Sequence, residues 1–209
     1  MTTWNSSFDT LAPGGAAFYG TPGVVPGRVE LPELAERTRG FDRASFNRRY
    51  RAPFLLQLNE NGTLQRTRST ARSGRFQTVV GARSLLGAAS ARLSGRVHAY
   101  ELKKREGANA FALMVTIGRA LNNDIVVPHP SVSKFHASLA LDKEGEWTLT
   151  DASSNGTWVD GERLARKHAR VVRPPSCMSL AREVILLLMS PDALFDELER
   201  FRNDLPPAA

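Results

Sequence analysis

Residues 149–161 read Leu-Thr-Asp-Ala-Ser-Ser-Asn-Gly-Thr-Trp-Val-Asp-Gly, and this stretch is the strongest indication of the fold. Asn155-Gly156 and Asp160-Gly161 are typical of tight turns, and the residues between them suit a short strand. Two further segments precede this stretch at intervals of about 15 to 20 residues, namely Gly118-Arg119 and Ser133-Lys134-Phe135-His136. Each segment stands between runs that predict β-strands, so we expect the three loops to meet at one end of a β-sandwich.

The side chains of these loops suit a phosphate group. Arg119 supplies a guanidinium, Lys134 an ammonium, Ser133 and Ser154 hydroxyls, and Asn155 a carboxamide. Such groups can hold a phosphate dianion and the backbone next to it. No nucleophile accompanied by a base stands among them. The pattern therefore predicts binding of a phosphorylated chain and no catalysis, and no cofactor is expected.

The order and spacing of these segments closely resemble the forkhead-associated (FHA) domain over about residues 96–189. The match is carried by Ile117-Gly118-Arg119, Asn123-Asp124-Ile125-Val126, Val132-Ser133-Lys134-Phe135-His136-Ala137 and residues 149–161. The resemblance implies a mainly β fold, an FHA-type antiparallel β-sandwich of about 11 strands. It also implies binding of phosphothreonine peptides through the loops at one end.

The resemblance assigns roles to individual positions. It places Arg119 on the phosphate and Asn155 on the peptide backbone beside the phosphothreonine. The chemistry of Ser133, Lys134 and Ser154 adds these three to the phosphate-binding set. Structural support of the site is expected from Gly118, His136 and Gly156, with the His136 ring hydrogen-bonded within the domain.

Two positions depart from the family pattern. Ser131 stands where some members carry a basic residue that helps to choose the residue after the phosphothreonine. Ala181-Arg182 replaces a commoner turn that contains glycine, and we expect it to alter a local bend and not the site.

Short apolar runs separated by turns define the expected elements. The predicted strands are 54–58, 96–103, 111–117, 124–127, 136–142, 147–150, 157–159, 169–172, 178–180 and 183–189. The spacing of Leu194, Phe195, Leu198 and Phe201 predicts a C-terminal helix, with Ser190 as its cap and Pro191 at its first position. One or two short helices are expected between Leu31 and Tyr50.

This division predicts five regions along the 209 residues. They are a disordered N-terminus (1–29), a small region with helices and a strand (30–62), a basic linker (63–94), the FHA domain (95–190), and the C-terminal helix and tail (191–209). The N-terminal extension is thus partly helical and partly disordered.

Charge and cysteine content restrict the class of protein. The formal net charge is +7, and residues 1–94 hold all of this excess, as 13 arginines against 6 acidic residues. The single cysteine, Cys177, excludes a disulfide framework, so a cytoplasmic location is expected. No metal site is expected, because the four histidines have no close ligand spacing. No apolar run approaches the length that spans a membrane, so no membrane partner is expected.

The partner predicted from the sequence is a phosphothreonine-containing protein, in signalling downstream of a Ser/Thr protein kinase. A second possibility is self-binding, in which Thr67 or Thr70 in the basic linker is phosphorylated and docks into the chain's own site. The alternative function is a structural assembly factor, in which the FHA fold makes contacts independent of phosphate. In that case the arginine-rich N-terminal half holds nucleic acid or an acidic surface. Nucleic acid is the less favoured partner, because few aromatic residues are available to stack on bases.

Overall fold

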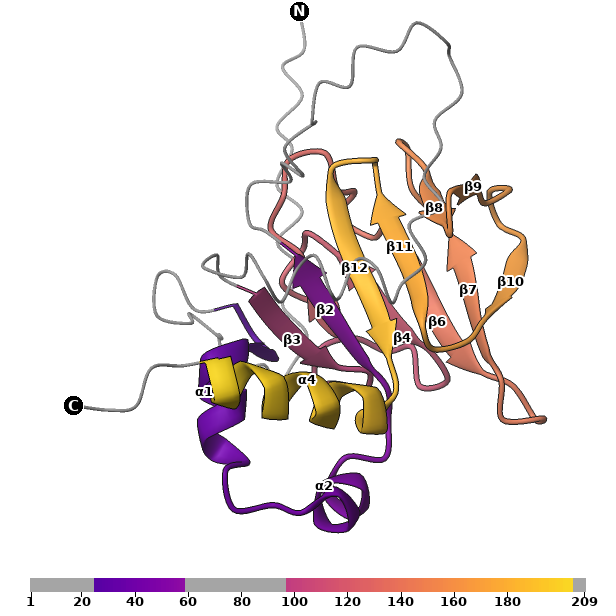
Figure 1. Cartoon of the computed structure of the whole chain (residues 1–209). Coiled ribbons are helices and arrows are strands. Elements are labelled where there is room, and N and C mark those ends of the chain that lie inside the picture. Colours follow the sequence, from indigo (N-terminus) through magenta and orange to yellow (C-terminus); the bar gives the residue numbers. More distant parts are fainter. Residues whose placement is uncertain (1–24, 59–96, 205–209) are drawn as a thin grey trace, which may run out of the picture.

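The computed structural model describes residues 25–58 and 97–204 as two facing β-sheets with helices at one end (Figure 1). The first sheet has seven strands in the order β1-β3-β2-β12-β11-β8-β9, and the second has five in the order β10-β7-β6-β4-β5. All neighbouring strands are antiparallel except β4 and β5. The predicted mainly β sandwich with a C-terminal helix is confirmed, with 12 strands against the expected 11.

The bounds of the elements in chain order are as follows. The N-terminal segment holds β1 (Arg28–Glu30), α1 (Leu31–Arg37), α2 (Arg43–Arg49) and β2 (Phe54–Leu58). The first half of the sandwich then holds β3 (Val97–Glu101), β4 (Val115–Gly118), β5 (Ile125–Val126), β6 (Ala137–Leu141) and β7 (Trp147–Asp151). The rest holds β8 (Thr157–Val159), β9 (Glu162–Arg163), β10 (Ala169–Val172), β11 (Ser176–Leu180), β12 (Val184–Met189) and α4 (Pro191–Asp204).

The N-terminal segment is built into the sandwich. The sequence analysis set residues 30–62 apart from the FHA domain, yet β2 lies between β3 and β12 in the middle of the seven-stranded sheet. Residues Phe54 to Gln57 are all buried, as expected for a strand that is covered on both faces. Leu55 faces the core between the two sheets, whereas Phe54 and Leu56 face the helices.

A second core lies between the seven-stranded sheet and the helices. Here α1 and α2 pack with α4 over the outer face of β3, β2 and β12, at the end of the sandwich away from the β11–β12 turn (Figure 1). Asp42 caps α2 by accepting the Ser45 N–H at 2.6 Å. Ser190 caps α4 by accepting the Ala193 N–H at 3.2 Å, so the predicted cap is confirmed.

The predicted strand 111–117 is wrong in its first half, because β4 begins only at Val115. Residues before it form a turn in which the Asn109 side chain accepts the Phe111 N–H at 3.1 Å. Such a side-chain turn competes with strand pairing. The Phe111 side chain is 51% exposed and Leu113 is 88% exposed, so these apolar residues do not belong to the core.

Several predictions fall on residues outside those that the structure describes. They are the disordered N-terminus up to residue 24, the basic linker with Thr67 and Thr70, and the tail beyond residue 204. The predicted N-terminal region ends within the described part, where Arg28 and Val29 belong to β1 and pair with β3.

We predict that Phe46→Ala in α2 lowers the free energy of unfolding of the full chain by about 3 to 5 kcal/mol. The Phe46 side chain is fully buried, with its ring 4.8 Å from Tyr50 and 5.4 Å from Phe195 between ring centroids. Urea denaturation measures the change. The matched control is Phe111→Ala at an exposed site, which should cost no more than about 0.5 kcal/mol. Equal losses in the two variants would contradict the second core.

Candidate functional site

Three loops carry the predicted site. They are the 119–124 loop between β4 and β5, the 127–136 loop between β5 and β6, and the 152–156 loop between β7 and β8. Hydrogen bonds join the first two, because the Arg119 N–H donates to the Ser133 carbonyl at 3.0 Å and the Ala120 N–H to the Lys134 carbonyl at 3.2 Å. Arg119 therefore lies beside Ser133 and Lys134.

Gly118 makes this close approach possible. A Cβ at position 118 would lie 2.3 Å from the Lys134 carbonyl oxygen and 2.9 Å from the Asn123 amide nitrogen. Both distances are shorter than atoms can tolerate. The Asn123 side chain completes the contact by donating to the Lys134 carbonyl at 2.6 Å and to the Ala120 carbonyl at 2.8 Å.

The 127–136 and 152–156 loops are joined through side chains. The Ser154 N–H donates to Ser133 Oγ at 3.1 Å, and the Asn155 amide donates to the Ser131 carbonyl at 2.8 Å. Because Ser133 Oγ already accepts a hydrogen bond, its own proton remains available to an incoming acceptor. Asn155 keeps its carbonyl oxygen and one N–H for another partner.

The buried His136 side chain joins the same two loops. Its Nδ1 accepts the Ser133 N–H at 3.1 Å, and its Nε2 donates to the Gly156 carbonyl at 3.2 Å. This pattern requires the neutral ring with the proton on Nε2. Burial lowers the pKa of His136 below 6.5, although the bond to Gly156 and the charge of Asp151 oppose this shift.

A buried network supports the 152–156 loop. Asp151 Oδ1 accepts hydrogen bonds from the hydroxyls of Ser153 and Thr157, each at 2.7 Å, and from the Ser153 N–H at 3.2 Å. Ser153 Oγ in turn accepts the Gly156 N–H at 2.7 Å. Gly156 has a φ of 94°, in the region that favours glycine. The sequence analysis quoted these residues within the motif but gave Asp151, Ser153 and Thr157 no role.

Asp124 fixes the start of β5 and the base of the first loop. Burial alone would raise the pKa of its carboxyl group, but the hydrogen bonds that it accepts lower the pKa below 3.8 overall. The donors are Lys104 Nζ at 2.7 Å, the Thr116 N–H at 2.8 Å and its hydroxyl at 3.0 Å, the Arg105 N–H at 2.9 Å and the Asn109 amide at 3.2 Å. The carboxylate thus ties the segment before β4 to the 119–124 loop.

The five residues predicted to contact the ligand are accessible at this end of the sandwich. Arg119, Lys134, Ser154 and Asn155 are exposed, and Ser133 is half-buried. Within residues 25–58 and 97–204, the side chains of Arg119 and Lys134 have no ion-pair or hydrogen-bond partner. Two exposed cationic side chains and a hydroxyl thus belong to loop segments that are bonded to each other, and these groups suit an anion.

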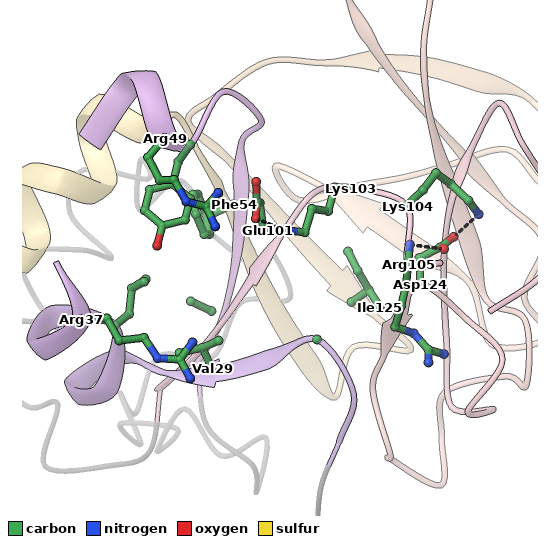
Figure 2. Close-up of a pocket in the computed structure, with 14 residues that line it drawn as sticks. Val29, Arg37, Arg49, Phe54, Glu101, Lys103, Lys104, Arg105, Asp124 and Ile125 are labelled. Atoms are coloured by element: carbon green, nitrogen blue, oxygen red, sulfur yellow. Dashed lines mark hydrogen bonds and ion pairs between the residues drawn. The ribbon is translucent and has the colours of Figure 1, made fainter. Parts of the chain in front are cut away.

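A pocket of about 240 Å³ lies elsewhere, between α1, α2 and the strands β1 and β3 (Figure 2). None of the five predicted contact residues lines it. Its basic side chains are largely engaged, since Lys103 pairs with Glu101 at 2.5 Å and Lys104 with Asp124 at 2.7 Å. We assign no ligand to it.

The described residues do not meet the requirements of a metal site, a reactive thiol or a membrane-spanning helix. No three His, Cys, Asp or Glu side chains come together as metal ligands there. Burial, with the nearby charge of Asp160, raises the pKa of Cys177 to about 11, so the thiol stays protonated at neutral pH and is a poor nucleophile. No helix in the same residues is both long and apolar enough to cross a bilayer.

A model of the FHA domain family matches residues 115–177, the segment that contains all three loops. No match is found among curated proteins.

Several solved structures are similar over the sandwich. The MEK1 FHA domain in complex with a HOP1 phosphothreonine peptide is 21% identical, with a TM-score of 0.36, over 44% of this chain and 87% of that chain. The N-terminal FHA domain of Rad53p from S. cerevisiae, in complex with a phosphothreonine peptide, is 17% identical, with a TM-score of 0.37, over 44% and 83%. The FHA domain of CT664 from Chlamydia trachomatis is 16% identical, with a TM-score of 0.40, over 66% and 98%.

We predict that the neutral His136 ring makes the fold sensitive to acid. Because the pKa in the folded state is lowered, the unfolded chain binds more protons below pH 6.5. The contribution of His136 to stability is complete above this pH and is lost as the pH falls toward the pKa of the folded state. NMR titration of the ring in the full chain should give a pKa below 6.5, and a value of 6.5 or higher would contradict the bonding pattern.

We also predict that Gly118→Ala separates the first two loops. The added methyl group must displace the Lys134 carbonyl, which should cost about 1 to 3 kcal/mol of stability. Urea denaturation of the full chain measures the loss. The control is Gly40→Ala, where a Cβ would meet nothing within 4 Å. A loss at Gly118 no larger than at Gly40 would show that the loops do not approach as described.

Proposed function

We propose that this chain is a phosphothreonine-peptide-binding adaptor in Ser/Thr kinase signalling, because a model of the FHA domain family matches residues 115–177. Arg119, Ser133, Lys134 and Ser154 bind the phosphate. Asn155 binds the peptide backbone beside the phosphothreonine. The protein acts by binding and not by catalysis, and we place it in the cytoplasm.

One observation carries the proposal. The Ser133 hydroxyl accepts the Ser154 N–H and keeps its own proton free to donate, and the backbone of Ser133 and Lys134 is bonded to that of Arg119 and Ala120, where Arg119 and Lys134 are exposed. A phosphate dianion offers the acceptors and the charge that these three groups lack. Each charge-assisted hydrogen bond contributes about 1.5 to 3 kcal/mol net. A few such bonds, less the entropy of ordering a peptide, are consistent with a Kd of about 1 μM.

Asn155 supports a peptide ligand over free phosphate. Its amide is held by the Ser131 carbonyl at 2.8 Å, while its remaining N–H and its carbonyl oxygen are exposed. One donor and one acceptor on a fixed carboxamide match the C=O and N–H of an extended backbone. The peptide chain would therefore cross the 152–156 loop.

The basic N-terminal half gives less support to the assembly-factor alternative. Where the structure describes it, several of its arginines serve the fold. Arg37 pairs with Glu33 at 2.5 Å and Arg39 with Glu36 at 2.8 Å, and Arg43 pairs with Asp192 at 3.5 Å and lies 5.1 Å from the centroid of the Phe195 ring. Cations that are already paired are weak attractants for nucleic acid.

The partner remains either another phosphothreonine-containing protein or the chain's own linker phosphorylated at Thr67 or Thr70. Both present the same chemical group to the same loops. A peptide of residues 62–75 phosphorylated at either threonine therefore belongs in any panel of ligands.

We predict that Arg119→Ala weakens binding of phosphothreonine peptides by about 100-fold or more, since two charge-assisted hydrogen bonds are lost. Isothermal titration calorimetry of the full chain, with the tightest peptide from an oriented phosphothreonine library, measures the change. Arg166→Ala is the control, because Arg166 is an exposed arginine in the loop between β9 and β10. It should bind as the wild type does.

The unphosphorylated form of the same peptide should not bind measurably. Unchanged affinity in the Arg119 variant, with its thermal unfolding unaltered, would exclude the phosphate-binding role. Equal binding of phosphorylated and unphosphorylated peptides would favour the assembly-factor alternative.

A further inference from the structure

One tryptophan and two arginines lie beside the 152–156 loop and have no part in the phosphate site proposed above. Trp158 of β8 is paired across the sheet with Arg163 of β9. The guanidinium carbon of Arg163 lies 5.4 Å from the centroid of the Trp158 ring, and that of Arg182 lies 4.7 Å from it. Contact with an aromatic ring restricts side chains that are otherwise flexible.

These arginines are adjacent to Asn155. A Cβ at Gly156 would lie 2.9 Å from Arg163 Nε, so the guanidinium is in contact with the residue that follows Asn155. The Ala181 N–H donates to the Gly156 carbonyl at 2.9 Å, which attaches the turn that carries Arg182 to the same residue. Both arginines are thus held at the edge of the predicted peptide path.

The turn that presents Arg182 has an unusual backbone. Ala181 and Arg182 have φ angles of 55° and 59°, a region that is unfavourable for residues with a Cβ and is normally occupied by glycine or asparagine. Arginine does not stabilise the turn itself at this positive φ. Its contact with Trp158 beside the site gives it a reason to be there.

The charge of the two arginines is not neutralised within the described residues. Both are exposed, and neither has a carboxylate within ion-pair distance. Of the two nearest acidic residues in sequence, Glu162 pairs with Arg170 at 2.9 Å, and Glu183 is exposed without an ion pair to either arginine. Two planar donors therefore remain open toward solvent, next to the place where a peptide would lie.

We propose that Arg163 and Arg182 form a second anion subsite, which selects a carboxylate side chain in the same phosphothreonine peptide. This inference rests on the function proposed above. Since an extended peptide advances about 3.3 Å per residue, a side chain two or three residues from the phosphothreonine reaches past Asn155 to this pair.

The test uses three peptides with one phosphothreonine each and with Glu, Gln or Lys at the second and third positions on both sides. The full-length wild type should bind the Glu peptide about five-fold more tightly than the Gln peptide, and the Lys peptide least tightly. Calorimetry at one fixed salt concentration gives the three affinities, because exposed charges are screened by salt.

The variant Arg163→Gln, Arg182→Asn removes both charges, with asparagine chosen because it tolerates the positive φ at position 182. We expect it to bind the Glu and Gln peptides equally and to keep the wild-type affinity for the Gln peptide. Arg182→Asn alone, at an exposed turn, should reduce the preference partially. Arg166→Gln, which changes the net charge without touching Trp158, should keep the full preference.

The outcomes separate the two proposals. A double variant that is folded and still prefers the Glu peptide would overturn the subsite while leaving phosphothreonine binding intact. A wild type that binds the Gln peptide but shows no preference for Glu would overturn the subsite as well. If the wild type binds no phosphothreonine peptide, the proposed function fails, and the subsite fails with it.

Discussion

The site depends on one neutral imidazole. His136 accepts a backbone N–H from the loop that carries Ser133 and donates to a backbone carbonyl of the loop that carries Asn155. A protonated ring could not accept the bond from the Ser133 N–H, so protonation of His136 would break one of the links between the two loops. Burial lowers the pKa of the ring and so favours the neutral form that joins the two loops, together with the bonds from Ser154 to Ser133 and from Asn155 to Ser131.

Strand β12 is packed between the two cores of the molecule. In β12, Leu186 and Leu188 face the core between the sheets, while Leu187 and Met189 face the helices. The strand is thus buried on both faces, and its other end begins at the turn that carries Arg182. The segment 25–58 and α4 together form the outer cover, so a region away from the loops stabilises the sheet that holds Trp158.

Local patterns predicted most of the strands and the C-terminal helix, because alternation, turn dipeptides and capping residues act over a few neighbouring positions. They did not predict the short strands β1 and β9. Nor could they predict that β2 lies between β3 and β12, since pairing between distant segments leaves no local signal. The predicted strand 111–117 began too early for a similar reason, because the turn that excludes Phe111 from β4 depends on the Asn109 side chain. The meeting of Arg163 and Arg182 on Trp158 is likewise tertiary.

The two groups of cations differ in what they can contribute to recognition. In the proposed site, Arg119, Lys134 and Ser133 would together make several charge-assisted hydrogen bonds to one dianion, so they would determine whether a peptide binds. Arg163 and Arg182 are exposed and screened, and an exposed ion pair contributes at most about 1 kcal/mol. That is too little to bind a peptide without the phosphate but enough to discriminate between phosphorylated peptides. The Gly156 carbonyl accepts hydrogen bonds from the His136 ring and from the Ala181 N–H, so one residue links the loop that carries Asn155 to the turn that carries Arg182.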